Sequence, residues 1–441
     1  MDNKVLYYIW LSTSLRPGSK TPKILFRHFG SIDKIYAAEK DDYKSLEISQ
    51  GEIAALTNKD LDIAKKCYDY CMRSNVGFLC YEDPYYPERL KIIDNPPAMF
   101  YYKGRLIHFD DNLCITMVGT RSCSERGFRM AYNEGFSAAC KGAVVVNGLA
   151  LGIDGACIAG ALDAEGYAIG LLGCGIDRVY PEGNRDLFKR LSEHGLILSE
   201  FAPFTKPIGS NFPIRNRVLS ALSVATVVFE AGEGSGALIT ARHAIEQGRR
   251  IFAVPGKPYD KNYAGPLELI KDGATVFTEA DDVLSEYSMS FPHRINLANT
   301  RKPSSEKLDK YVSRYFKKDT DPDTPVNRRY AYKSGPANQQ NNSTSPETKV
   351  VEAEPIIKKE DKTPFIEKRV DVSDTQKEKS VDLSLFSTVE IAVYETVKKN
   401  GSMTPDEITA HGFKIDEVLA ALTILEIYGL VAAEPGGKYK A

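Results

Sequence analysis

The segment CITMVGTRS, residues 114–122, is the most informative about the fold, because a run of strand length passes directly into a glycine turn. Its first five residues lack the alternation of polar and apolar side chains that marks a strand with one solvated face. Near-continuous apolar runs of this kind are typical of strands that are buried on both faces of a parallel sheet. Residues 114–118 are therefore predicted to form such a strand, and Gly119 allows the tight turn that follows it.

Six further runs share this texture and alternate with helical patterns up to residue 284. They are residues 142–146, 167–172, 196–198, 224–229, 251–254 and 274–277. Strands that alternate with helices favour an α/β domain. We expect an extended Rossmann-like fold with a doubly wound, mostly parallel sheet over residues 81–284.

The flanking segments differ in texture from this domain. Residues 1–80 have a helical pattern and predict a small helical domain, and the Pro- and Tyr-rich stretch 85–104 is expected to be a connector. Residues 285–380 are rich in Lys, Glu, Pro, Ser and Asn and are expected to be a disordered linker. Residues 381–441 predict a winged helix, with helices over 388–399, from Thr404-Pro405-Asp406-Glu407 and over 416–428, then a hairpin.

Composition narrows the class of protein. With 441 residues the chain is long enough for two or three domains, and its net charge of −2 requires any nucleic-acid contact to come from a local cluster. The eight cysteines form no metal-ligand pattern and are expected to be reduced and mostly buried. Residues 1–11 lack the features of a signal peptide, and no stretch is apolar enough to span a bilayer, so we expect a cytoplasmic protein without membrane contact.

Glycine-bearing loops follow several of the predicted strands. They occupy residues 119–122, 147–155, 173–177, 230–240 and 255–257. In open α/β sheets, ligands bind beyond the carboxyl ends of the strands, where glycines and helix N-termini accept phosphate. Arg121 could form a bidentate phosphate contact there. The alternative is that each glycine only permits a tight turn.

The run NFPIRNR, residues 211–217, is a more specific signal. It places two arginines around a phenylalanine just before a helical pattern. Guanidinium groups can hold phosphates while an aromatic ring stacks on a base, which suits a single strand of nucleic acid. The alternative is an Arg-rich helix start that pairs with Glu200 or Glu230. Lys206 either extends the basic path or is only solvated.

The succession GTR at 119–121, NGLALGID at 147–154, GCGID at 173–177, NFPIRNR at 211–217 and FAVPG at 252–256 resembles the DNA-processing protein A family, also called Smf. The resemblance covers roughly residues 81–284. It implies a Rossmann-like domain that binds single-stranded DNA, forms a homodimer and loads the RecA recombinase during natural transformation. It also implies a sterile-alpha-motif-like N-terminal domain and a C-terminal winged helix.

Carried over to this sequence, the resemblance implies a set of DNA-binding residues. They are Gly119, Arg121, Lys206, Asn211, Phe212, Arg215, Asn216, Arg217, Ser235, Gly236 and Thr240. The sequence departs from the family pattern at Asn147 and Leu151, where Ser and Arg are usual, at Cys157, which replaces a common His, and at Phe204, which replaces a Gly.

Other function classes fit the residues less well. A nucleoside-monophosphate phosphoribohydrolase-like enzyme would carry a PGGxGTxxE loop, whereas residues 230–237 read EAGEGSGA. No GxGxxG follows the first strand of the sheet, as a Rossmann oxidoreductase would need. Asp154, Asp177 and Glu200 pair with no nucleophile or metal, and all three are better explained as loop caps. We expect no catalysis and no cofactor.

Both flanking domains leave alternatives open. The N-terminal turn Arg16-Pro17-Gly18-Ser19 is similar to a helix-hairpin-helix, whose main-chain amides could hold a DNA phosphate. The alternative is a plain turn between two helices. The predicted last helix at the C-terminus carries Asp416, Glu417 and Glu426. This is too acidic for major-groove reading and favours a protein-interaction or auxiliary role.

Overall fold

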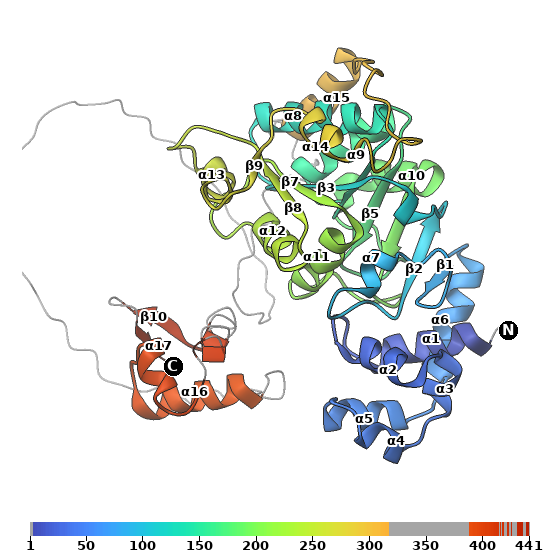
Figure 1. The fold of residues 1–441 in the computed structure, drawn as a ribbon, viewed down its shortest axis with the longest axis vertical. Coiled ribbons are helices and arrows are strands. Elements are labelled where there is room, and N and C mark those ends of the chain that lie inside the picture. Colours follow the sequence, from blue (N-terminus) through green and yellow to red (C-terminus); the bar gives the residue numbers. More distant parts are fainter. Residues whose placement is uncertain are drawn as a thin grey trace, which may run out of the picture. The chain divides into compact units, whose positions relative to one another are not determined.

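The computed structural model describes residues 3–316 and residues 388–440, the latter with gaps at 414, 416, 419–420, 423–424, 426–429 and 435–437. The chain divides into two compact units, Met1–Ser334 and Gly335–Ala441. Figure 1 shows the ribbon of both units. Each is described by itself.

The first unit is built around a nine-stranded sheet, counted over the described residues, in the order β1-β2-β6-β5-β4-β3-β7-β8-β9. The neighbours among β3 to β9 all pair in parallel. The predicted α/β fold with a mostly parallel sheet is thus confirmed. The strands are β1 (Gly77–Cys80), β2 (Met99–Gly104), β3 (Cys114–Val118), β4 (Val144–Asn147), β5 (Ala168–Leu172), β6 (Leu196–Ser199), β7 (Ala225–Val228), β8 (Arg250–Ala253) and β9 (Thr275–Val276).

The strand order reverses at β3. The chain goes from β3 to β4, β5 and β6 on one side and then returns to place β7 on the other side of β3. The loops that leave β3 and β7 therefore run in opposite directions and open a crevice at the carboxyl ends of these strands. Such a reversal point is where open α/β sheets bind their ligands.

The prediction that residues 85–104 form only a connector is wrong in its second half. Residues 99–104 form β2, which pairs antiparallel with both β1 and β6 and extends the sheet. Phe100 and Tyr101 are fully buried. The prolines at 96 and 97 force extended backbone, and tertiary pairing with β6 continues that extension as a strand.

Helices cover both faces of the sheet, as Figure 1 shows. Ile115 and Met117 of β3 pack on one side with α8 and α9, whereas Cys114 packs with α11 on the other. The first face carries α8 (Glu125–Cys140), α9 (Ile153–Asp163), α10 (Arg185–His194), α14 (Asp281–Tyr287) and α15 (Ser305–Phe316). The second carries α7 (Glu88–Lys91), α11 (Asn211–Leu222) and α12 (Gly236–Glu246), and α13 (Ala264–Lys271) lies beside β8.

Helices α8 and α9 approach each other closely at two glycines. A Cβ atom added to Gly160 would lie 2.0 Å from the main-chain oxygen of Tyr132, and one added to Gly135 would lie 2.3 Å from that of Cys157. Gly160→Ala should therefore force the helices apart and lower the free energy of unfolding by about 1 kcal/mol or more. Thermal unfolding measures this. Gly51→Ala, whose Cβ would meet nothing within 4 Å, should leave stability unchanged or slightly higher.

The N-terminal helices pack on the sheet unit through the turn at residues 16–19. They are α1 (Asn3–Ser14), α2 (Thr21–Phe29), α3 (Ile32–Ala37), α4 (Lys40–Lys44), α5 (Gln50–Thr57) and α6 (Asp62–Arg73). The main-chain N–H of Gly18 donates to the Glu200 carboxylate at 3.3 Å, and the Asn95 amide donates to the Gly18 carbonyl at 3.1 Å. The Gly18 N–H is therefore used in a contact within the protein, and a plain turn between two helices is the better interpretation.

The prediction that the disordered linker begins at residue 285 is wrong, because residues 285–316 are ordered. They include the end of α14 and all of α15, which packs on α8 with Leu308 and Val312 buried. Leu308 and Val312 are four residues apart and lie on one helix face, so the segment does bury apolar surface. The remainder of the expected linker, residues 317–380, lies outside the described residues.

In the second unit, the described residues contain α16 (Thr388–Asn400), α17 (Pro405–Thr409), β10 (Ala432–Glu434) and β11 (Lys438–Lys440). A capping box between Thr404 and Glu407 starts α17, and β10 pairs antiparallel with β11. The predicted third helix lies largely outside the described residues. The assignment of this unit as a winged helix stays a prediction.

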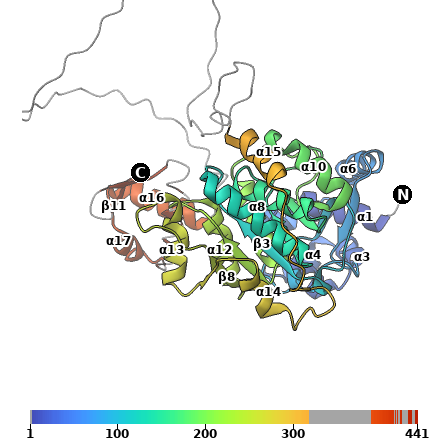
Figure 2. The same ribbon diagram turned by 90° about the horizontal axis from the view of Figure 1, so that it is seen from above.

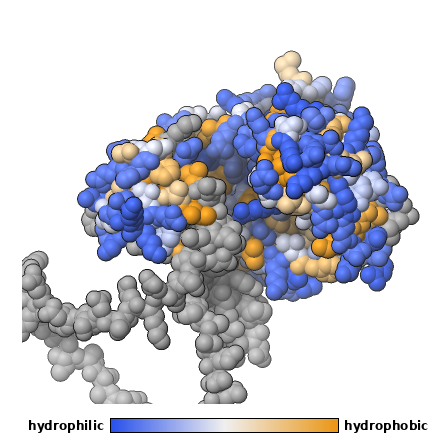
Figure 3. Space-filling model, turned by 90° about the horizontal axis from the view of Figure 1, so that it is seen from below, coloured by the Kyte–Doolittle hydropathy of each residue, from blue (hydrophilic) through white to orange (hydrophobic). Residues whose placement is uncertain are grey.

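The described part of the chain holds no helix that is both long and apolar enough to cross a membrane. The face drawn in Figure 3 is mainly hydrophilic, with hydrophobic side chains in small separate patches. All eight cysteines are free thiols, and all but Cys80 are buried. Within the described ranges, no group of His, Cys, Asp and Glu side chains has the arrangement of a metal site.

Candidate nucleic-acid interface

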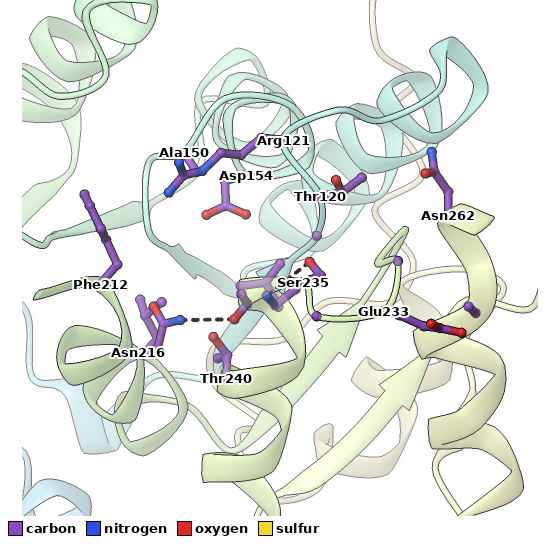
Figure 4. Close-up of a pocket in the computed structure, with 18 of the residues that line it drawn as sticks. Thr120, Arg121, Ala150, Asp154, Phe212, Asn216, Glu233, Ser235, Thr240 and Asn262 are labelled. Carbon is purple, nitrogen blue, oxygen red and sulfur yellow. Dashed lines mark hydrogen bonds between the residues drawn. The ribbon is translucent and has the colours of Figure 1, made fainter. Parts of the chain in front are cut away.

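A cavity of about 680 Å³ lies at the carboxyl ends of β3 and β7, where the strand order reverses. Figure 4 shows its walls, which come from the loop after β3, the starts of α11 and α12, and the segment just before α13. Eight residues of the predicted set line it. They are Gly119, Arg121, Phe212, Arg215, Asn216, Ser235, Gly236 and Thr240.

Arg121 and Phe212 form the solvent-facing part of this site. The guanidinium carbon of the exposed Arg121 lies 5.5 Å from the centroid of the Phe212 ring. The half-buried ring also stacks on Tyr180, with centroids 5.5 Å apart. A Cβ at Gly173 would come within 2.7 Å of this ring, so a glycine is needed there. An exposed cation and an aromatic face thus lie side by side.

Arg215 lies behind Phe212 and corrects the predicted phosphate grip. Its guanidinium is buried and donates to the main-chain oxygens of Gly148 and Leu171, at the carboxyl ends of β4 and β5. Burial lowers the pKa of this group to about 10, and the negative charge of Asp154 opposes that shift. Arg215 therefore stays charged at neutral pH as a fixed positive charge beneath the ring.

Arg217 does not line this cavity. Its side chain is 4% exposed and forms a 2.7 Å salt bridge with Glu200, which also accepts the N–H of Gly18. Residues 211–217 were predicted to precede a helix, but they are its first turns. Two residues along a helix are about 200° apart around its axis, so Arg215 and Arg217 face opposite directions. The alternative of an arginine paired with Glu200 is correct for Arg217.

Two further predicted residues lie away from the cavity. Asn211 is buried at the start of α11, and its side-chain amide donates to the main-chain oxygen of Lys206 at 3.2 Å. Lys206 is exposed. Neither lines the cavity, so they shape the approach to α11 rather than the site itself.

The amino end of α12 faces the cavity (Figure 4). The Ser235 hydroxyl accepts the N–H of Ala237, and the Asn216 side-chain amide donates to the Gly236 carbonyl at 3.1 Å. Thr240 lines the same wall and is 1% exposed. A helix N-terminus concentrates partial positive charge and N–H donors, which favours an anion at this wall.

Asp154 places a carboxylate in the cavity, but this carboxylate is already hydrogen-bonded to main-chain N–H groups. It accepts the N–H of Gly148 at 3.1 Å, and Asn147 donates to its main-chain oxygen at 2.8 Å. Burial raises the pKa of the Asp154 carboxyl, while Arg215 and the N–H donors oppose that rise. These bonds join the loop after β4 to the start of α9, which is the expected loop-capping role.

The segment just before α13 forms a further wall of the cavity, which the sequence did not indicate. Lys261 and Asn262 line the cavity, and the Asn262 side chain donates to the Glu230 carboxylate at 2.9 Å. The only available signal was that they follow the predicted loop at 255–257. At Phe204, where the family pattern has glycine, φ is +73°. That backbone conformation is one that glycine adopts most easily.

Residues 77–288 match the family model described as DNA recombination-mediator protein A. The chain is 40% identical to DNA processing protein DprA of Bacillus subtilis (strain 168) over 201 residues, which are 46% of this chain and 68% of that protein.

Streptococcus pneumoniae provides both a sequence relative and a solved structure. Its DNA processing protein DprA (strain ATCC BAA-255 / R6) is 37% identical over 207 residues, covering 46% of this chain and 72% of that protein. An X-ray structure of DNA processing protein A from Streptococcus pneumoniae superposes with a TM-score of 0.51 at 29% identity. That match covers 65% of this chain and 98% of the other.

Proposed function

The chain belongs to the DNA processing protein A family, and from this we propose that it binds single-stranded DNA in the cavity at the carboxyl ends of β3 and β7. The observation that carries this proposal is the exposed Arg121 beside the ring of Phe212. A guanidinium suits a phosphate, and an aromatic face suits an unpaired base. In a duplex the bases are already stacked on each other, so this combination favours a single strand.

The rest of the cavity supports the same ligand. The amino end of α12 offers N–H groups to a second phosphate, and the buried charge of Arg215 adds positive potential beneath Phe212. These contacts read the backbone and the base plane rather than the base edges. The proposed binding is therefore largely independent of sequence.

The biological role that we propose is to protect single-stranded DNA and load the RecA recombinase onto it during natural transformation. The name of the matching family model, a recombination mediator, supports the link to recombination. The family resemblance supports a homodimer that acts in the cytoplasm. A nucleotide-processing enzyme is less well supported, because the Asp154 carboxylate is engaged by main-chain N–H groups.

Arg121→Ala tests the site. Removing one phosphate contact should weaken single-strand affinity several-fold and flatten the dependence of log K on log salt by about 0.7. Fluorescence anisotropy with a labelled oligonucleotide at several salt concentrations measures both. Arg242→Ala is the matched control, since Arg242 is an exposed arginine of α12 that does not line the cavity.

The same assay with duplex DNA and with a mononucleotide separates the alternatives. We expect the unmodified protein to prefer the single strand over both at fixed salt. Equal affinity for a mononucleotide together with release of free base would favour the enzyme instead. An unchanged affinity in folded Arg121→Ala protein would remove Arg121 from the site.

A further inference from the structure

Helix α15 lies beyond the segment that matches the family model, which ends at residue 288. It packs across α8 and α10, and Figure 2 shows it beside both. Asp309 forms a 2.7 Å salt bridge with Arg129 of α8, and the Tyr311 hydroxyl accepts a 2.6 Å hydrogen bond from Arg190 of α10. These contacts fix the helix along its length.

The last turn of α15 reaches the Arg121 loop. The hydroxyl of Tyr315 donates a hydrogen bond to the main-chain oxygen of Arg121, although the two residues are 194 positions apart. The Tyr315 ring stacks on Phe128 of α8, with centroids 5.0 Å apart and planes 29° apart. Tyr315 also lies against Cys123, and burial raises the pKa of that thiol to about 12. The hydroxyl is thus held in place by the packing of its own ring.

The loop is otherwise anchored on either side of Arg121. The N–H of Thr120 donates to the Glu230 main-chain oxygen at 2.6 Å, and the N–H of Ser124 donates to the Glu230 carboxylate at 2.7 Å. The Arg121 carbonyl also packs closely against Gly152, where a Cβ would lie 2.8 Å from the Arg121 oxygen. Tyr315 and Gly152 therefore both contact this peptide group.

We propose that Tyr315 is a positioning residue for DNA binding, which fixes the peptide group of Arg121 so that its side chain extends over Phe212. This inference rests on the proposed function. The orientation of a peptide group limits the directions available to its side chain. A guanidinium that is already oriented loses less conformational freedom when a phosphate binds.

Tyr315→Phe is the direct test, because it removes the hydroxyl and keeps the ring on Phe128. Single-strand affinity should fall about 2- to 10-fold, which corresponds to one net hydrogen bond, with little change in the melting temperature. Tyr311→Phe removes a hydroxyl from the same helix that bonds Arg190 instead. It should leave DNA affinity unchanged.

A double-mutant cycle separates positioning from a general structural effect. In the Arg121→Ala background, Tyr315→Phe should have no further effect on affinity, because the side chain that it positions is gone. An equal loss in both backgrounds would overturn the proposal. Wild-type affinity in Tyr315→Phe, alongside a loss in Arg121→Ala, would overturn it while leaving the proposed function intact. Absence of single-strand binding by the unmodified protein would overturn both.

Discussion

Glu200→Gln should lower the free energy of unfolding by about 3–5 kcal/mol, because it leaves the buried charge of Arg217 without its partner. The two side chains are 4% and 11% exposed, and Arg217 donates to Glu200 at 2.7 Å. Glu200 also accepts the N–H of Gly18, so the substitution weakens the docking of the N-terminal helices. Trp10, the only tryptophan of the chain, is buried among those helices and reports their unfolding by fluorescence in a urea titration.

The matched control for this prediction is Glu182→Gln. Its partner Arg185 is 61% exposed and Glu182 itself is 59% exposed, so the pair is screened by water. Its loss should change stability by less than about 1 kcal/mol. Glu200→Gln should also keep its affinity for single-stranded DNA at temperatures where it is folded. A gain in DNA affinity without a loss of stability would instead indicate that the released Arg217 contacts the DNA.

Phe212→Ala should weaken single-strand binding by about 1–3 kcal/mol, the usual worth of one base stacked on an aromatic ring. The salt dependence of the affinity should stay unchanged, because no charge is removed. This distinguishes Phe212 from Arg121, whose loss flattens that dependence. Anisotropy titrations at several salt concentrations give both quantities.

Phe212→Tyr keeps the aromatic face and should bind almost as well as the unmodified protein. Arg215 lies 5.9 Å from the Phe212 ring, so its cation–π contact is also retained in that variant. Equal loss in the Ala and Tyr variants would contradict base stacking at this position. A flattened salt dependence in Phe212→Ala would mean that the ring acts only by orienting Arg121.

The unexpected positions of Arg215 and Arg217 have one physical origin. Arg215 and Arg217 look equivalent in the sequence, and a loop conformation would have let both reach a phosphate. Once Asn211 begins a helix, the periodicity of that helix turns Arg215 toward the strand ends and Arg217 toward Glu200. Whether a polar segment before a helix joins that helix depends on what packs against it.

The amino-acid pattern alone was enough to predict the parallel sheet and the edge at which the candidate site lies. Short apolar runs with glycine exits, such as residues 114–119, form buried strands for local reasons of backbone sterics and hydrophobic pattern. Because parallel strands end at the same edge, the loops after them had to share one side of the sheet. Arg121 and Phe212 could be assigned to the site on that basis and on the family resemblance.

Long-range packing, by contrast, sets which charged groups face the cavity and which elements support them. The contact of Tyr315 with Arg121 spans 194 positions, and no local pattern in α15 indicates it. Strand β2 likewise depends on pairing with β6, which the chain reaches about ninety residues later. Such contacts depend on how distant segments pack, because the sequence around a side chain does not indicate which distant residue it will contact.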